Sequence, residues 1–413
     1  MLQRKKTLKS NETFANIANN KSLKSEITYI GPILGHGDNM GIFGTTLIYL
    51  ITNLFSGKVN LFVPFCNRLD GTPNIDYGPN VVIKSTYKVN SIRSLFLSAY
   101  NIGKMKSSLA IFNFFPTSLG RGRLKNFVWS LVPIYLRLNR IRVMVIFHNS
   151  VSTSDWKALG YTGLIDRIGV IVFGRVERLI FKLTQSVFLL RTYKDMISEK
   201  FNMNVFAAEF KYLDSIAAFL SSNYANSKFI ESDNDNRIKT IHIHGHFGPQ
   251  KDIEFALTVL NEIANEGINF RLIITGSVNP HFSDYKRKME YLLNEYESII
   301  SEVIMPISET LIFDSFKKTD ILLLPYKAAG GRSAVMDLGA FFDIDVIVFK
   351  HLEFTEQASW YKNIYLIRPQ DLKRELIHLL EQPSKKKVID IDSKIHDSLN
   401  VMESLLKTCI DLI

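Results

Sequence analysis

Short apolar runs alternate with longer segments of helical periodicity from residue 26 onward. Continuous apolar runs such as 143–147 (VMVIF) predict strands that are buried on both faces, as in a parallel sheet. In the first half of the chain the pattern predicts strands at 26–30, 59–64, 81–84, 109–114, 142–147 and 186–190, with helices at 45–54, 92–105 and 165–184.

A polar segment then interrupts the alternation. Residues 221–236 read SSNYANSKFIESDNDN, and a stretch so rich in Ser, Asn and Asp predicts a linker between domains. Beyond it the pattern predicts strands at 240–244, 270–275, 302–305, 321–324 and 346–349, with helices at 252–266, 284–298, 331–342 and 394–412. Two such series predict an α/β protein with two Rossmann-like, doubly wound domains that face each other across a cleft.

The length of 413 residues agrees with this division. We expect an N-terminal domain over 26–220, a linker over 221–237 and a C-terminal domain over 238–392. The basic tail 1–25 is expected to be disordered. A helix within 393–413 is expected to pack back on the N-terminal domain.

Composition excludes several classes of protein. Hydrophobic residues at 46% and charged residues at 22% are typical of a folded globular chain and exclude a largely disordered one. The only two cysteines, Cys66 and Cys409, are far apart in sequence, which argues against a disulfide framework and a cysteine-based zinc site. No secretory signal and no apolar stretch long enough to span a bilayer are evident, so we expect a cytoplasmic protein.

The formal net charge of +10 is concentrated in two segments. Residues 1–24 hold six basic residues against one acid, and residues 120–142 hold six basic residues and no acid. Such a field suits an anionic partner: nucleic acid, a phospholipid surface or a phosphorylated substrate. Because apolar residues interleave with the charges of 120–142, this segment predicts either a helix lying on an anionic membrane surface or a core helix with a solvated basic edge.

Loops that follow predicted strands hold residues suited to a phosphorylated ligand. Gly35 and Gly37 lie in a glycine-rich loop that leads into a helix, where backbone N–H groups are available to an anion. His148 directly follows the strand 142–147, where a histidine can act as a general base or bind a sugar hydroxyl.

The C-terminal half holds the more specific signals. Lys251 stands at the start of a predicted helix, where an anionic ligand would explain a cation that the helix dipole disfavours. After the strand 321–324, Gly331, Arg332 and Ser333 could bring backbone amides, a guanidinium and a hydroxyl to one phosphate. Three histidines alternate along one strand, at positions 242, 244 and 246, but no cysteine or paired acid completes a ligand set, so no metal site is expected.

Together these segments resemble the retaining glycosyltransferases of the group 1 type, which have the GT-B fold. The resemblance is strongest over 238–350. The family carries an Arg-x4-Lys pair that contacts the donor diphosphate; Lys251 matches the Lys, and His246 stands at the Arg position. The resemblance also implies donor-binding roles for Gly276, for Ile307 in a loop that reads the base, and for the run Gly331, Arg332, Ser333 and Ala334, and it places His148 near the sugar and the acceptor.

The sequence departs from the family in one respect. Many members carry two glutamates with seven residues between them, and here Gly330 and Leu338 stand at those positions. Asp337 lies one residue away, so ribose binding falls to Asp337 or is lost. His246 in place of Arg also weakens the diphosphate clamp at neutral pH.

The resemblance implies transfer of a sugar from a nucleotide-diphosphate donor with retention at the anomeric carbon. It implies no metal and no resident cofactor, because the nucleotide sugar is a co-substrate. The expected acceptor is a glycan or a polyprenyl-phosphate-linked lipid, as in polysaccharide synthesis, with an anionic membrane surface as a further candidate partner. Two alternatives stay open: a sugar-nucleotide epimerase, for which no paired catalytic groups are found, and a non-catalytic GT-B-like binding subunit. No nucleic-acid-binding motif is present, so nucleic acid is not an expected partner.

Overall fold

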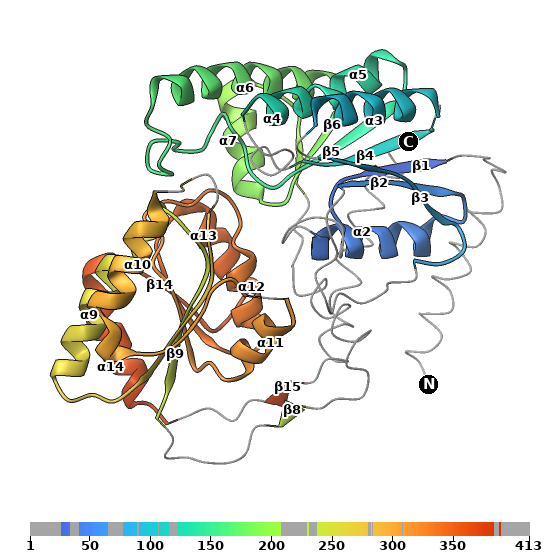
Figure 1. Ribbon diagram of the computed structural model, residues 1–413. Coiled ribbons are helices and arrows are strands. Elements are labelled where there is room, and N and C mark those ends of the chain that lie inside the picture. The colour runs from blue at the N-terminus through green and yellow to red at the C-terminus, as the bar shows by residue number, and fades with distance from the viewer. Residues whose placement is uncertain are drawn as a thin grey trace.

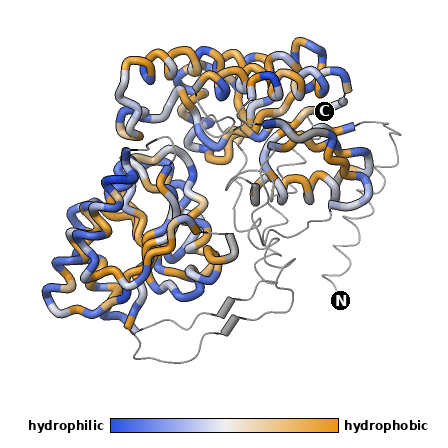
Figure 2. Tube along the Cα trace, in the orientation of Figure 1, coloured by the Kyte–Doolittle hydropathy of each residue, from blue (hydrophilic) through white to orange (hydrophobic). Residues whose placement is uncertain are grey.

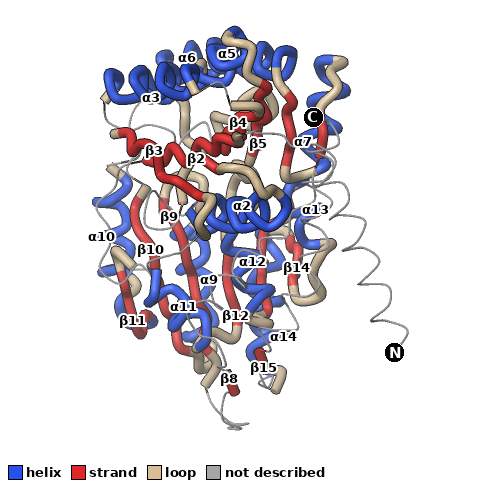
Figure 3. Tube along the Cα trace, turned by 90° about the vertical axis from the view of Figure 1, so that its right-hand side faces the viewer, coloured by secondary structure: helices blue, strands red, loops and turns tan. Residues whose placement is uncertain are grey.

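Two parallel sheets, each covered by helices on both faces, make up the protein (Figure 1). The computed structural model describes residues 26–33, 41–64, 77–88, 91–105, 107–114, 123–207, 229–230, 238–279, 282, 284–307, 309–383 and 388–389. Hydrophobic positions are concentrated along the strands and the helix faces that cover them (Figure 2). The turned view shows the two layered halves one above the other (Figure 3).

The N-terminal sheet has seven strands in the order β3-β2-β1-β4-β5-β6-β7. They are β1 (Ile27–Ile30), β2 (Val59–Pro64), β3 (Val81–Tyr87), β4 (Leu109–Phe114), β5 (Arg142–Phe147), β6 (Gln185–Phe188) and β7 (Phe206–Ala207). One face packs against α2 (Gly41–Leu54). The other face packs against α3 (Ile92–Lys104), α4 (Arg123–Ser130), α5 (Val132–Leu138), α6 (Leu164–Leu183) and α7 (Arg191–Phe201).

The C-terminal sheet has six strands in the order β11-β10-β9-β12-β13-β14. They are β9 (Thr240–Phe247), β10 (Arg271–Val278), β11 (Ile300–Ile304), β12 (Ile321–Leu324), β13 (Asp345–Phe349) and β14 (Ile364–Ile367). One face is covered by α9 (Ile253–Asn265), α10 (Tyr285–Glu295) and α14 (Leu372–Glu381), and the other by α11 (Glu309–Lys317), α12 (Ala334–Phe341) and α13 (Leu352–Ala358). Two short segments, β8 (Phe229–Ile230) and β15 (Val388–Ile389), pair antiparallel.

Both sheets reverse their strand order at the first strand. β1 lies between β2 and β4, and β9 lies between β10 and β12. In a parallel sheet the loops at the carboxyl ends of the strands diverge at such a reversal and leave room for a ligand. The topology therefore directs attention to the ends of β1 and β4, and of β9 and β12.

The predicted α/β fold is confirmed, and most predicted elements are present within a few residues. The predicted helix 331–342 begins instead at Ala334, because Gly331 has φ +130° and Ser333 caps the helix. The predicted strand 240–244 continues to Phe247, because β10 pairs with it through Val278. The tail 1–25, Gly35, Gly37, the helix in 393–413 and most of the linker lie outside the described residues, so those predictions stay open.

The segment 120–142 is part of the core within its described residues, 123–142. Trp129 and Leu136 are fully buried, and Val132 is 4% exposed. All three belong to the core between the helices and the N-terminal sheet. Proline lies within the first turn of α5, so the segment divides into two helices rather than one kinked helix. Arg137 remains exposed at the edge. The prediction of core helices with a solvated basic edge therefore fits the described residues, while contact of this segment with a membrane stays a prediction.

No helix among the described residues is both long enough and apolar enough to cross a membrane.

Candidate functional site

A buried cation lies at the strand-order reversal of the C-terminal sheet. Lys251 follows β9 and is only 4% exposed. Its Nζ donates a hydrogen bond of 2.8 Å to the carbonyl of His244 and lies 4.9 Å from the ring centre of Tyr326. No carboxylate of the described residues forms an ion pair with this ammonium. Because a buried charge is costly without a counter-charge, a bound anion would stabilise this ammonium.

The backbone around Lys251 joins the loops after β9 and β12. Lys251 forms an antiparallel bridge with Tyr326, and the amide of Asp252 donates to the carbonyl of Pro325 at 2.6 Å. The amide of Lys327 donates to Gln250 at 2.8 Å. These bonds fix the lysine at the carboxyl end of β12, where the two loops of the reversal meet.

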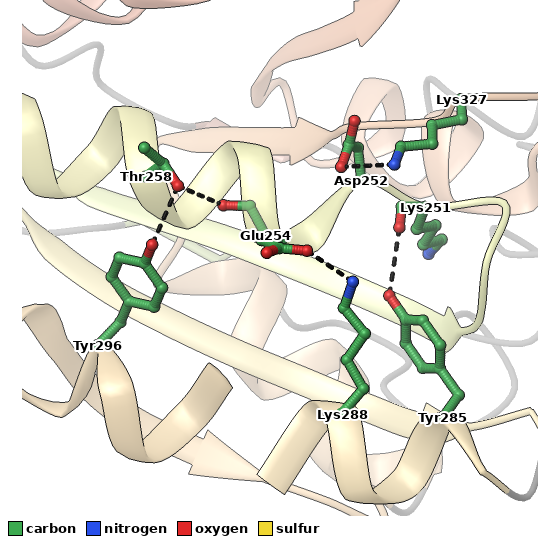
Figure 4. A network of polar contacts seen from close by, with 8 residues as sticks. All are labelled: Lys251, Asp252, Glu254, Thr258, Tyr285, Lys288, Tyr296 and Lys327. Carbon is green, nitrogen blue, oxygen red and sulfur yellow. Dashed lines mark hydrogen bonds and ion pairs between the residues drawn. The ribbon is translucent and has the colours of Figure 1, made fainter. Parts of the chain in front are cut away.

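The neighbouring polar side chains form a separate network (Figure 4). Asp252 pairs with Lys327 at 3.0 Å, and Glu254 pairs with Lys288 at 2.6 Å. Lys251 takes part in this network through its carbonyl, which accepts from Tyr285 at 3.3 Å. The acids near the start of α9 are therefore paired with Lys288 and Lys327 rather than with Lys251.

Two glycines, Gly245 and Gly276, leave the space that the Lys251 ammonium occupies. A Cβ atom at Gly245 would lie 2.3 Å from Nζ of Lys251 and 3.9 Å from Val335 in the first turn of α12. A Cβ atom at Gly276, on the neighbouring strand, would lie 2.0 Å from the carbonyl oxygen of Gly245. Since both glycines have positive φ, at +132° and +138°, no other residue fits either position without strain. Ile307 also lies here, and its amide donates to the carbonyl of Gly276 at 3.2 Å.

The first turn of α12 presents open backbone amides. Ser333 caps the helix with its hydroxyl, which accepts from Met336. Gln357 clamps the backbone of Ser333 by accepting from its amide at 3.0 Å and donating to its carbonyl at 2.7 Å. The amides of Ala334 and Val335 have no acceptor among the described residues. A helix N-terminus with open amides beside a buried lysine is a site suited to phosphate.

Arg332 and Asp337 form a buried ion pair inside the C-terminal domain. Arg332 Nε and Nη2 lie 3.0 Å and 2.9 Å from one carboxylate oxygen of Asp337, and the guanidinium lies over the ring of Trp360. Tyr361 donates to the other oxygen of Asp337 at 2.6 Å. Burial raises the pKa of Asp337, while the charge of Arg332 acts in the opposite direction. In this arrangement the pair holds the loop before α12, and its proposed contacts with a donor stay predictions.

His148 follows β5, and its side chain reaches the strand-order reversal of the N-terminal sheet through Asn113 at the end of β4. Its Nε2 is 2.6 Å from Oδ1 of Asn113, whose Nδ2 donates to the hydroxyl of Tyr29 at 3.1 Å. That hydroxyl donates to the carbonyl of Pro32 at 2.9 Å. Because the Nδ2 group of Asn113 donates to Tyr29, the atom of Asn113 that faces the histidine is Oδ1, which can only accept. Nε2 of His148 therefore carries the proton, and Nδ1 is the acceptor atom of the ring.

The histidine is neutral over the physiological range. Burial, followed by the nearby charge of Arg332, lowers the pKa of His148 to about 3. A neutral imidazole with an Nδ1 lone pair can accept a hydrogen bond from a hydroxyl group.

The two candidate loops touch each other across the domains. Asn149 Nδ2 donates to the carbonyl of Gly330 at 2.8 Å. A Cβ atom at Gly331 would lie 3.0 Å from the carbonyl oxygen of His148 and 3.1 Å from the side chain of Asn149. The structure therefore brings His148 and the loop before α12 together.

The histidines of β9 are bonded to hydroxyl groups. His242 and His244 both contact Oγ1 of Thr275, at 2.8 Å and 2.7 Å, and His246 contacts Ser277 at 2.8 Å. Burial lowers the pKa of all three, with the charge of Lys251 adding to the effect at His246. His246 is therefore a neutral group and supplies no cation beside Lys251. Among the described residues no group of three His, Cys, Asp or Glu side chains is placed to hold a metal ion.

Two carboxylates that position the site were missed in the sequence. Glu177 on α6 accepts from the amides of Val151 and Ser152, at 2.8 Å and 2.9 Å, and so holds the loop that follows His148. Glu356 on α13 accepts from the first amides of α7 in the other domain, at 2.7 Å each. A lone acid on the buried face of α6 was a signal for Glu177, whereas the contact of Glu356 depends on the domain arrangement and had no local signal.

Solved structures similar to the whole chain are glycosyl-transfer enzymes. Sucrose-phosphate synthase from Thermosynechococcus elongatus matches with a TM-score of 0.62 at 15% identity, covering 94% of this chain and 99% of that chain. Trehalose 6-phosphate synthase from Burkholderia multivorans matches with a TM-score of 0.61 at 10% identity, covering 94% and 97%. HepE of Anabaena, solved in complex with UDP, matches with a TM-score of 0.57 at 9% identity, covering 94% and 100%.

Sequence comparison assigns the chain to no family. No protein-family model matches the chain, and no curated protein matches it. At these low identities the structural likeness establishes the architecture alone. The two Rossmann-like sheets and their match over nearly the full length show that this chain has the GT-B fold.

Proposed function

We propose that the protein is a glycosyltransferase that takes its sugar from a nucleotide-diphosphate donor bound at Lys251. The observation that carries this proposal is the buried ammonium of Lys251, which has a carbonyl but no carboxylate of the described residues as its partner. The amides of Ala334 and Val335, which have no acceptor among the described residues, lie in the first turn of α12. Gly245 lies between this turn and the ammonium, since a Cβ atom there would meet both Val335 and Nζ of Lys251. A diphosphate matches both features, because it carries several negative charges and many acceptor oxygens.

The proposed donor is a UDP-sugar. HepE, which has the same architecture, has been solved with UDP and with UDP-glucose. In this chain the loop of Ile307, bonded to Gly276, is the candidate for reading the base. These relationships support UDP-sugars as the first probes.

The reaction is proposed to proceed with retention at the anomeric carbon. The bond between that carbon and the diphosphate breaks, a bond to the acceptor oxygen forms on the same face, and the acceptor's proton passes to the departing diphosphate. Lys251 and the amides of α12 stabilise the charge that develops on the leaving group. His148 accepts a hydrogen bond at Nδ1 from a sugar hydroxyl and so fixes the reacting ring. No resident cofactor or metal is required in this scheme, because the fixed cation and the helix amides hold the leaving group.

The acceptor is proposed to be a glycan or a polyprenyl-phosphate-linked lipid bound by the N-terminal domain. That assignment follows the resemblance and the basic character of this domain.

A second candidate function is a binding subunit without turnover. One observation favours it. Gly330 and Leu338 stand where the family has glutamates, and the carboxylate of Asp337 already accepts hydrogen bonds from Arg332 and Tyr361. Such a subunit would bind the nucleotide but release no sugar.

Thermal unfolding with a panel of UDP, GDP, TDP and their sugar forms tests the proposal. A ligand at a hundred times its Kd adds about 2.7 kcal/mol to the free energy of unfolding. We expect one diphosphate to raise the melting temperature of the wild type and not of Lys251→Ala. If no nucleotide raises it, the donor proposal is wrong. Nucleotide binding without product, in assays with glycan and lipid-linked acceptors, would select the binding subunit.

A further inference from the structure

The outward face of α6 is apolar over its first half. Leu164, Ile165, Ile168 and Ile171 are 73%, 66%, 53% and 57% exposed. Their spacing places them on one side of the helix, opposite the buried Ile180 and its neighbours in the core. The helix therefore has two apolar faces, and the core formed by the described residues uses only one of them.

The outward face of α3 has the same character. Phe96, Leu97 and Tyr100 are 59%, 52% and 49% exposed. α3 and α6 pack on the same side of the N-terminal sheet and contribute to the same core, so their outward faces both point away from that sheet (Figures 1 and 2). α4 and α5 lie between α3 and α6 and pack against both, so the four helices form one layer. Exposed apolar residues gathered on one layer mark an interaction surface.

The helices that carry this surface are rich in positive charge. The four helices α3, α4, α5 and α6 hold nine Lys and Arg residues against two acids. Of the acids, Glu177 is buried beneath the loop after His148, and Asp166 accepts from the amide of Gly163 at the start of α6. Arg175 and Lys182 follow Ile168 at seven-residue intervals, so they share its side of α6.

We propose that this surface docks the protein on a lipid bilayer with anionic headgroups. It consists of the exposed apolar residues of α3 and α6 with Arg175 and Lys182, and we call it the α3/α6 face. Apolar side chains at the level of the headgroups, with Lys and Arg beside them on anionic lipid, are the chemistry of peripheral membrane binding. A second copy of the chain fits the face less well, because a symmetric dimer would set the two positive surfaces against each other.

The site of membrane contact thus differs from the one that the sequence suggested. Most apolar residues of 123–142 are in the core, with Leu124 and Leu138 exposed, whereas those on α6 were predicted only as part of an ordinary helix. The proposal is independent of the donor site, so its test needs no turnover.

Vesicle co-sedimentation of the full-length protein tests the proposal. We expect the wild type to bind vesicles of phosphatidylcholine mixed with phosphatidylglycerol and to bind pure phosphatidylcholine weakly. The double substitution Ile168→Glu with Ile171→Glu should reduce partitioning at least about tenfold. Replacing Arg175 and Lys182 with Gln should reduce it about fivefold for each charge. Because the basic tail is present in every variant, the comparison isolates the helix face.

Leu311→Glu is the matched control, since Leu311 is 45% exposed on α11 in the other domain. It should bind vesicles like the wild type, and circular dichroism melts should show that all variants are folded. A wild type that stays in the supernatant would overturn the proposal, as would a double variant that binds undiminished. Sedimentation velocity without vesicles provides a further check: a wild-type dimer that the double substitution dissociates would assign the face to a second copy instead.

Discussion

Asn149 donates a hydrogen bond of 2.8 Å to the carbonyl of Gly330 and so joins the loop of the buried His148 to the loop that precedes α12. The bond crosses from one sheet to the other at the carboxyl ends of their strands. Next to it, Gly331 lies so close to His148 and Asn149 that a methyl group would touch both. The proposed function assigns the sugar of a donor bound at Lys251 to this junction, beside His148.

Replacing Gly331 with Ala should weaken this junction. The residue has φ +130°, and its Cβ atom would lie 3.0 Å from a backbone oxygen, so strain and crowding add. We expect a loss of about 2 kcal/mol in the free energy of unfolding, measured by urea denaturation. Gly330→Ala is the control: its Cβ atom would meet only the side chain of Leu159, which can move, and stability should change by less than half as much.

Glu356 should contribute to the stability of the domain arrangement. Its carboxylate accepts from the amides of Arg191 and Thr192, and a negative charge is favourable at the start of α7. Glu356→Gln should lower the free energy of unfolding by about 1 kcal/mol in urea denaturation. Glu353→Gln, which loses only a 3.4 Å contact with Tyr193, should have little effect; equal losses in the two variants would contradict the assignment.

The buried histidines make stability sensitive to acid. Burial lowers the pKa of His242 to about 3, so the folded state keeps this ring neutral while the unfolded chain binds a proton near pH 6.5. The stabilising contribution is complete above pH 6.5 and is lost as the pH falls from there towards 3. Thr319 donates to the carbonyl of Ser315, so it accepts from Nδ1 of His242. A second proton on the ring would then lie on Nε2, which could no longer accept from the hydroxyl of Thr275.

The histidine's share of this acid sensitivity can be measured directly. Urea denaturation at pH 7.5 and 5.5 should give a steeper loss of stability for the wild type than for His242→Gln. One histidine accounts for about 1.4 kcal/mol per pH unit once the unfolded state is protonated. Identical pH slopes would show that His242 titrates normally in the folded protein.

His148 should matter for turnover and little for nucleotide binding. Its ring is held by Asn113 in the N-terminal domain, whereas Lys251 belongs to the C-terminal domain. In the proposed reaction, His148→Gln should lower kcat about a hundredfold and leave the Kd for the nucleoside diphosphate within about twofold of the wild type. Stopped-time assays of diphosphate release, with calorimetry for binding, separate the two effects. A variant with wild-type kcat would remove His148 from the catalytic machinery.

Much of the fold was predictable because its signals are local. Apolar runs such as those of β5 and β12 marked buried parallel strands, and the alternation with helices gave the two doubly wound sheets. The positions of Lys251 and Gly331 at strand ends were visible for the same reason. What had no local signal was the partner of each charged group: Asp337 holds Arg332, and Glu356 caps a helix of the other domain. Such pairings depend on tertiary placement, as does the division of 123–142 between core and surface.

The central claim is that the buried ammonium of Lys251 binds the donor diphosphate, and isothermal titration calorimetry tests it most directly. Lys251→Met keeps the length and apolar stem of the side chain and removes its charge. Lys327→Met removes a nearby lysine that pairs with Asp252 at the surface and is the matched control (Figure 4).

With the diphosphate identified by the thermal panel, Lys251→Met should weaken binding at least about thirtyfold, the equivalent of about 2 kcal/mol. Lys327→Met should stay within about twofold of the wild type. Equal affinities for the wild type and Lys251→Met would contradict the account and place the nucleotide elsewhere.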